Sequence, residues 1–207
     1  MSHYFETPDE PLVTRTIDAT VFGNDLTFTT ARGVFSGTRL DPGTSVLLRE
    51  IDPPSEGHIL DLGCGFGPIA VGLAVASPKV TVDAVDVNAH AVALTNMNAE
   101  AHGVADRVRA ATDAQGPFDE IWSNPPIRIG KDALHTLLLR WLPRLRQDGT
   151  AWMVVAPSRG LQNGAKSLRP RRRGAASFRS ATSTPCRSAT TWPRCSGSGT
   201  WSAGSTR

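Results

Sequence analysis

Two short motifs in this chain combine residues that can bind a nucleoside-bearing cofactor with residues that can hold an amine. Residues 61–67 read DLGCGFG and residues 124–127 read NPPI, and each follows an apolar, strand-like run. Either motif alone is a weak signal, because glycine-rich turns serve many nucleotide folds and proline marks ordinary loops. Together they predict methyl transfer from S-adenosylmethionine to a planar nitrogen.

The first motif has the layout of a loop that closes around a nucleoside. Residues 58–62 predict a buried parallel strand, and the three glycines of residues 63–67 permit a tight turn with close approach of a ligand. Pro68 suits the first position of the helix that follows, because its missing N–H would be unpaired there. The next strand, 80–86, ends in Asp86, which we expect to bind the ribose hydroxyls.

The glycine spacing and one carboxylate separate two cofactor classes. A dinucleotide enzyme would carry Gly-x-Gly-x-x-Gly with the pyrophosphate at the helix N-terminus, whereas this loop has Gly-x-Gly-x-Gly directly after Asp61 and Leu62. A carboxylate in that place would repel a pyrophosphate and attract a sulfonium or ammonium group. The loop therefore favours S-adenosylmethionine over a dinucleotide.

The second motif can orient an exocyclic amine, which is a poor nucleophile because its lone pair is delocalised into the base. The Asn124 side-chain oxygen and the Pro125 carbonyl can each accept one N–H, and the two prolines stiffen the loop so that this geometry is preset. Ile127 offers apolar contact but no aromatic face on which a base could stack. A rigid exit from a strand, without chemistry, is the alternative reading of this motif.

Four segments together resemble the methyltransferase small domain family, whose best-known members are guanine-N2 methyltransferases of ribosomal RNA. They are GVFS at 33–36, LDPGT at 40–44, DLGCG at 61–65 and NPPIRIGK at 124–131, in the family's order. The resemblance covers roughly residues 3–157, with a further stretch at 164–168. It implies a class I S-adenosylmethionine-dependent enzyme acting on an exocyclic base nitrogen, above all guanine N2, in ribosomal RNA or a ribosomal subunit precursor.

The motif chemistry and the resemblance together assign roles to individual residues. The methyl-acceptor site is expected at Asn124, Pro125, Pro126 and Ile127. S-Adenosylmethionine is expected to contact Asp61, Gly63, Cys64, Gly65, Gly67, Asp86, Asn88, Asp113 and Asn124. Arg128 and Lys131 could grip phosphates that flank the target base, although charges in such places are usually solvated. For Asp113 a turn before Gly116-Pro117 is the alternative, and Cys64 is expected to be a small residue that fits rather than a nucleophile.

Alternating strand and helix signals predict an α/β fold of the Rossmann-like class I methyltransferase type. Strands are expected at 58–62, 80–86, 108–111, 118–123 and 151–156, and helices at 44–51, 68–76, 89–102 and 131–142. This alternation predicts a mostly parallel sheet with helices on both faces and ligands at the carboxyl ends of its strands. Runs at 17–22 and 26–29, around Gly23-Asn24-Asp25, predict an N-terminal β-hairpin that caps the core.

Charge is distributed unevenly along the chain. Residues 1–148 hold twelve basic and nineteen acidic residues, whereas residues 149–207 hold ten basic residues and no acidic one. Beyond about residue 170 the composition is rich in Arg, Ser, Thr, Gly, Ala and Pro without helical or strand periodicity. We therefore expect the antiparallel strands that close the family's sheet to be missing.

These signals divide the chain into three parts. Residues 1–50 are expected to form the hairpin and a lead-in helix packed on the core, and residues 51–168 the S-adenosylmethionine-dependent methyltransferase domain. Residues 169–207 are expected to be a basic tail, either disordered or translated out of frame. An RNA-binding arm remains the other explanation, because clustered arginines neutralise phosphates.

Composition argues against several other classes of protein. No apolar run approaches the roughly eighteen residues that a membrane span needs, and no signal-peptide pattern opens the chain, so we expect a cytoplasmic protein without a membrane partner. Cys64, Cys186 and Cys195 are too widely spaced for a metal site. Oligomeric state stays open. Two functional alternatives also stay open: a glutamine-N5 protein methyltransferase, which usually has an aromatic residue after Asn-Pro-Pro, and a non-catalytic product that keeps only the cofactor pocket.

Overall fold

Strands and helices alternate through most of the computed structural model, which describes residues 12–125, 131–155, 164–170 and 176–180. The strands are β1 (Thr14–Val21), β2 (Asn24–Ala31), β3 (Glu56–Leu62), β4 (Lys79–Val85), β5 (Val108–Ala111), β6 (Phe118–Ser123), β7 (Leu145–Val155), β8 (Gly164–Pro170) and β9 (Ala176–Ser180). The helices are α1 (Pro42–Glu50), α2 (Pro68–Ala76), α3 (Ala89–Ala101) and α4 (Lys131–Trp141), and a 3-10 turn, η2, spans Leu142–Arg144.

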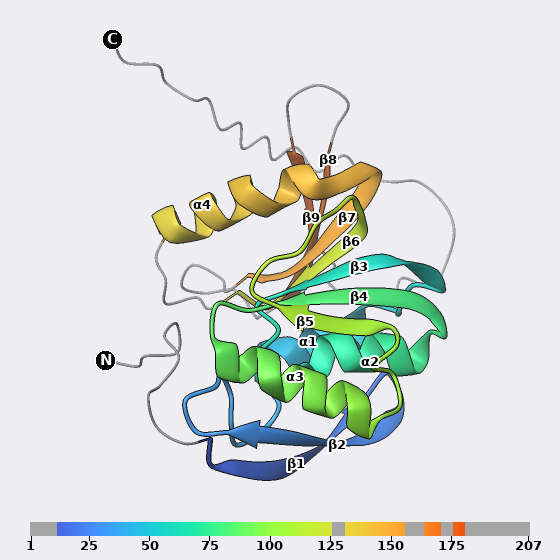
Figure 1. The fold of residues 1–207 in the computed structure, drawn as a ribbon. Coiled ribbons are helices and arrows are strands. Elements are labelled where there is room, and N and C mark those ends of the chain that lie inside the picture. The colour runs from blue at the N-terminus through green and yellow to red at the C-terminus, as the bar shows by residue number, and fades with distance from the viewer. Residues whose placement is uncertain (1–11, 126–130, 156–163, 171–175, 181–207) are drawn as a thin grey trace.

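Seven strands form one sheet in the order β5-β4-β3-β6-β7-β8-β9. The first five strands of that order pair in parallel, and each pair is joined through a crossover. Helices α1, α2 and α3 lie on one face of the sheet and α4 lies on the other (Figure 1). Two apolar clusters fill these layers, one between the sheet and α2 and α3, the other beneath α4. The expected α/β class, with its mostly parallel sheet, is confirmed.

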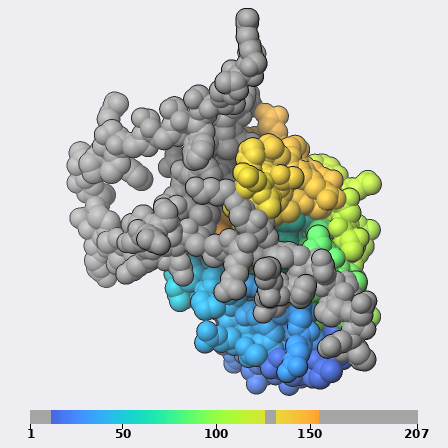
Figure 2. Space-filling model, turned by 90° about the vertical axis from the view of Figure 1, so that its left-hand side faces the viewer, coloured from blue at the N-terminus to red at the C-terminus, as the bar shows by residue number. Residues whose placement is uncertain are grey.

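The N-terminal hairpin is present, with its turn one position earlier than expected. Val21 pairs with Asn24, so the two turn residues are Phe22 and Gly23, with φ of 48° and 77°. Positive φ at both central residues matches the right-handed twist of the two strands. The hairpin packs against α2 and α3 on their side away from the sheet, where Val21 stands directly over Gly72. In the space-filling view it lies at the opposite end of the molecule from α4 (Figure 2).

One buried amide fastens the hairpin to the glycine-rich loop. Asn98 of α3 accepts a hydrogen bond from the Thr29 N–H at 2.7 Å and donates to the Thr29 carbonyl at 2.8 Å. The same amide nitrogen donates to the Phe66 carbonyl at 2.7 Å. Asn98 is only 1% exposed and its bond to Phe66 is buried, so an unpaired amide here would be costly. The hairpin and the loop are therefore held to the same helix.

The expectation that the closing antiparallel strands are missing is wrong. β8 pairs antiparallel with β7, from Val155↔Gly164 to Ala151↔Leu168, and β9 pairs antiparallel with β8. β9 and the end of β8 fall in the segment whose composition predicted a tail without structure. Strand pairing is made by backbone groups, and β7 would otherwise leave a row of them unpaired at the sheet edge. Side-chain periodicity was therefore a poor guide here.

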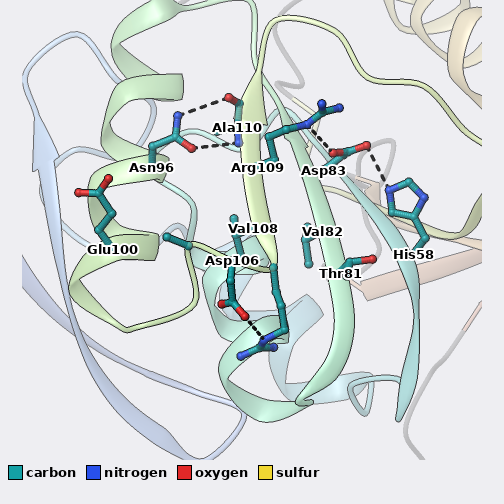
Figure 3. A pocket seen from close by; sticks show the side chains of 12 residues that line it. His58, Thr81, Val82, Asp83, Asn96, Glu100, Asp106, Val108, Arg109 and Ala110 are labelled. Carbon is teal, nitrogen blue, oxygen red and sulfur yellow. Dashed lines mark hydrogen bonds and ion pairs between the residues drawn. The ribbon is translucent and has the colours of Figure 1, made fainter.

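The other edge of the sheet is closed by a side chain. The Ala110 N–H of β5 donates to Asn96 Oδ1 at 3.0 Å, and Asn96 Nδ2 donates back to the Ala110 carbonyl at 3.4 Å (Figure 3). The Val108 N–H donates to the Val104 carbonyl at 3.0 Å. The backbone of this short strand thus has partners on its outer side as well as on β4.

Candidate functional site

A cavity at the carboxyl ends of β3 and β6 brings the two predicted motifs together. Gly63 and Gly65 of the glycine-rich loop line it, and so does Asn124, which follows β6. Asp41 and Thr44, at the start of α1, complete that wall. The segment before α1 contributes further lining residues, Phe35, Ser36 and Leu40. Parallel strands present their carboxyl ends at one edge of a sheet, which is why residues so distant in sequence meet here.

The glycine-rich loop is anchored to the end of the neighbouring strand. The Gly63 and Cys64 N–H groups donate to the Val85 carbonyl at 2.8 and 3.1 Å. A Cβ built on Gly63 or on Gly65 would meet no atom within 4 Å. Each of these two glycines therefore leaves room for at least a methyl group beside the loop, and their contact with the cofactor stays a prediction.

Gly67, at the end of the loop, is constrained in a different way. Its φ is 89°, and a Cβ there would lie 2.9 Å from Thr95 Cγ2. Thr95 cannot move freely, because its hydroxyl donates to the Gly65 carbonyl at 3.1 Å and is buried. Gly67 therefore serves the packing of the loop on α3. It is not among the residues that line the cavity, and its contact with the cofactor stays a prediction.

Asp61 is a buried carboxylate that holds the first turn of α2. Its Oδ2 accepts a hydrogen bond from the Ala70 N–H at 3.0 Å, replacing a side-chain cap that Gly67 cannot provide. Its Oδ1 is buried without a partner in the described part of the chain. Burial, with a smaller contribution from the nearby Asp86, raises the pKa of Asp61 to about 7. A cationic group close to Asp61 Oδ1 would offset the energetic cost of burying the ionised carboxylate.

Asp86 and Asn88 follow β4, and Asp86 binds the glycine-rich loop from the other side. Asp86 accepts the Gly65 N–H on Oδ2 at 3.0 Å and the Asn88 N–H on Oδ1 at 2.9 Å. Burial raises the pKa of Asp86, against the opposing effect of these N–H groups. Asn88 is 1% exposed; its oxygen caps α3 at the His90 N–H and its nitrogen donates to the Gly33 carbonyl at 3.2 Å. Asn88 thus supports the site through hydrogen bonds within the protein. A direct contact between its side chain and the cofactor stays a prediction.

Cys64 and Asp113 occupy contrasting environments. Burial raises the pKa of the Cys64 thiol well above its ordinary value, so the thiol stays protonated, in agreement with a packing role. Asp113 lies on the surface after β5, paired with Arg140 and Arg144 at 3.1 and 3.0 Å. The Ala114 N–H and the Arg144 guanidinium hold the pKa of Asp113 below its ordinary value. These ion pairs tie Asp113 to α4 and η2, and its contact with adenine stays a prediction.

Asn124 stands at the junction of β6 with the cavity. It is 8% exposed, and its Nδ2 donates to Asp41 Oδ1 at 2.7 Å and to Thr44 Oγ1 at 2.9 Å. The preceding Ser123 hydroxyl donates to the Leu62 carbonyl at 2.7 Å, which fixes the end of β6 against the end of β3. Pro125 is buried beside it. Pro126, Ile127 and Arg128 lie outside the described residues, and of Lys131 only its place at the start of α4 is described.

Sequence reasoning missed the two partners of Asn124. Asp41 and Thr44 belong to the LDPGT segment, which contributes to the family resemblance but by itself predicts no role for either residue. The signal available was structural: Asp before Pro marks a helix N-cap, and Asp41 indeed caps α1 through the Gly43 and Thr44 N–H groups. Nothing in the sequence pairs this cap with a residue more than eighty positions away.

A larger hollow of about 580 Å³ lies around the β5 edge and contains none of the predicted site residues. Most of its charged groups pair with one another (Figure 3): Asp83 pairs with His58 and Arg109, both at 3.1 Å. Asp106 and Arg107 form a longer pair at 3.9 Å. The hollow is therefore less suited to chemistry than the smaller cavity between the two motifs. In the described residues no cluster of three His, Cys, Asp or Glu side chains could hold a metal ion, and no helix is long and apolar enough to cross a membrane.

Comparisons with known proteins agree with this fold. Residues 25–168 match the family model described as methyltransferase small domain. The uncharacterized protein YbxB of Bacillus subtilis is 34% identical over 80% of this chain and 86% of its own length. The ribosomal RNA small subunit methyltransferase C of Citrobacter koseri is 43% identical over 64% of this chain, which spans only 41% of that relative. In structure, the chain resembles the Thermus thermophilus 16S rRNA N2 G1207 methyltransferase, solved with AdoMet and guanosine, with a TM-score of 0.63 and 26% identity over 72% of this chain and 44% of that protein.

Proposed function

The chain belongs to the methyltransferase small domain family, and we propose that it transfers a methyl group from S-adenosylmethionine to the N2 amine of guanine in ribosomal RNA. One observation carries this proposal: the glycine-rich loop and Asn124 line the same cavity. A cofactor loop and an amine-holding amide are the two parts that such a transfer needs within reach of each other. The proposal includes both free RNA and an assembled subunit precursor as the acceptor.

The residues present fit S-adenosylmethionine. Gly63 and Gly65 leave open space in front of the loop, and the buried Asp61 Oδ1 has no partner within the described residues. Two carboxylates beside one loop, Asp61 and Asp86, favour a ligand that is cationic and carries hydroxyl groups. When bound, S-adenosylmethionine supplies a methyl group on a positively charged sulfur. We assign Asp86 to the ribose hydroxyls and the loop glycines to close backbone contact with the nucleoside.

Asn124 and Pro125 are the residues that we assign to the acceptor amine. The Asn124 oxygen and the Pro125 carbonyl each accept one N–H of the amine, which turns the nitrogen lone pair out of conjugation with the base and toward the methyl group. Because Asn124 is nearly buried, these hydrogen bonds form with little competition from water. Guanine as the base rests on the Thermus thermophilus enzyme, which is named for N2 methylation of a guanosine, and ribosomal RNA rests on that enzyme and the Citrobacter koseri relative. This chain spans less than half the length of either.

The test is a methyl-transfer assay with isotopically labelled S-adenosylmethionine and small-subunit RNA, offered free or in subunits. We expect label in N2-methylguanosine after digestion of the RNA to nucleosides. Asn124→Ala should lower the transfer rate about a hundredfold or more, because it removes one preorganised polar contact, while binding of S-adenosylhomocysteine stays unchanged. Gln147→Ala, which removes an exposed amide near the start of β7, away from the cavity, is the matched control.

Two results would contradict the proposal. If wild-type protein binds S-adenosylhomocysteine but labels no RNA, the acceptor is wrong, and label recovered in a protein glutamine would identify the alternative acceptor. If Asn124→Ala retains wild-type turnover on RNA, the amide does not hold the amine.

A further inference from the structure

We propose that Asp41 and Thr44 are positioning residues that fix the orientation of the Asn124 amide, so that its oxygen rather than its nitrogen faces the acceptor amine. The inference rests on the proposed function and concerns residues that the sequence motifs left without a role. It explains why the start of α1 belongs to the wall of the cavity.

The Asn124 amide nitrogen has two N–H groups, and both have a partner. One donates to Asp41 Oδ1 at 2.7 Å and the other to Thr44 Oγ1 at 2.9 Å. Among the described residues, no hydrogen bond from the protein reaches the Asn124 oxygen. The donor half of the amide is thus used up inside the protein, and the acceptor half remains for a ligand.

Asp41 determines which half of the amide points inward. An ionised carboxylate can only accept hydrogen bonds, so a flipped amide would set its oxygen against the Asp41 oxygen and lose both bonds. The Thr44 hydroxyl alone would not fix the orientation of the Asn124 amide, because a hydroxyl can donate as well as accept. An amide that donates to a carboxylate is also polarised, which makes its own oxygen a stronger acceptor.

The carboxylate is itself held in place by the helix it caps. Asp41 Oδ1 accepts the Gly43 N–H at 2.8 Å and the Thr44 N–H at 3.3 Å. A Cβ on Gly43 would lie 2.9 Å from Val154 Cγ1 and 3.2 Å from Asn124 Oδ1. Glycine at this position therefore lets the start of α1 approach the ends of β6 and β7 closely enough for the contact with Asn124.

Asp41→Gly tests the inference with little disturbance of the fold, because glycine is nearly as good a helix N-cap as aspartate. The variant removes the oxygen that accepts from Asn124, so the orientation is no longer imposed. We expect kcat to fall roughly ten- to a hundredfold, as for a small displacement of a reacting group, with unchanged KM for RNA and unchanged affinity for S-adenosylhomocysteine. Asp18→Ala, which removes an exposed carboxylate that accepts from Thr27, is the control.

A double mutant separates positioning from general damage. If Asp41 acts through Asn124, then Asp41→Gly should lower kcat no further in the Asn124→Ala background. Thr44→Val should reduce kcat in the wild-type background and Thr44→Ser should keep it near the wild-type value, since the serine keeps the hydroxyl. If Asp41→Gly lowers kcat equally with and without Asn124, or lowers it in neither background, the inference is overturned.

A second measurement does not depend on activity. The two side-chain N–H signals of Asn124, identified by their disappearance in Asn124→Ala, should exchange with solvent at least about tenfold more slowly in wild type than in Asp41→Gly, as expected for hydrogen-bonded groups out of water. Equal exchange rates would overturn the orienting role. Slow exchange in a protein that methylates no RNA would support the orientation and refute the proposed function, so the two failures are distinguishable.

Discussion

Adding one methyl group at three different glycines should separate cofactor binding from folding. Gly63, Gly67 and Gly103 all have φ between 68° and 89°, where any other residue is strained by roughly 1–2 kcal/mol. An added Cβ at Gly63 or Gly103 meets nothing within 4 Å, whereas at Gly67 it lies 2.9 Å from the buried Thr95 side chain. Overpacking of that kind adds about 1–3 kcal/mol. Gly63→Ala and Gly103→Ala should therefore lose about 1–2 kcal/mol of stability and Gly67→Ala about 2–5 kcal/mol.

Urea unfolding and calorimetric titration with S-adenosylhomocysteine measure the two effects separately. Gly63→Ala should unfold at the same urea concentration as Gly103→Ala. It should nevertheless bind the ligand far more weakly, because its methyl group projects into the space in front of the loop. Gly103 ends α3 away from the cavity, so Gly103→Ala reports the backbone strain alone and should keep wild-type affinity. Equal affinity for Gly63→Ala and Gly103→Ala would refute the assignment of that space to the cofactor. Equal stability for Gly63→Ala and Gly67→Ala would refute the packing argument.

Two further perturbations address the carboxylates beside the loop. Burial raises the pKa of Asp61 from 3.8 to about 7, so the folded protein binds more protons than the unfolded chain between these values, and the free energy of unfolding should fall as pH rises through that window. Asp61→Asn should remove this part of the slope in urea unfolding measured across the same pH range, and identical slopes would show that Asp61 is not the group responsible. Asp86→Ala should weaken binding of S-adenosylhomocysteine by about 1.5–3 kcal/mol in calorimetry, the range for hydrogen bonds to a charged group. Unchanged affinity would exclude Asp86 as the ribose ligand.

The parallel core could be predicted because its signals are local and strong. β5 and β6 lie at the predicted residues, and β3, α2 and β4 agree within two positions. Glycine and proline marked the loop between β3 and α2, and long apolar runs marked the buried strands around it. These elements form where they are predicted because the local sequence preferences agree with the contacts made in the fold.

The missed features depend on contacts between distant parts of the chain. β9 forms where the sequence has no strand periodicity, because β8, itself paired with the edge of β7, supplies the hydrogen bonds. The Asp41 contact with Asn124 joins residues that only the folded sheet brings together. Asp113 was assigned from its place after a strand, but its arginine partners on α4 and η2 could not be seen in the sequence.

The amide that closes β5 bears on how the folded protein behaves among other copies of itself. An open edge strand is a template on which a second chain can add, and proteins protect such edges from aggregation. Here the Ala110 N–H and carbonyl are occupied by Asn96, and the Val108 N–H by the Val104 carbonyl. A second chain would have to displace these groups before it could pair with β5. Resistance to edge-to-edge polymerisation at this end of the sheet thus depends largely on one asparagine.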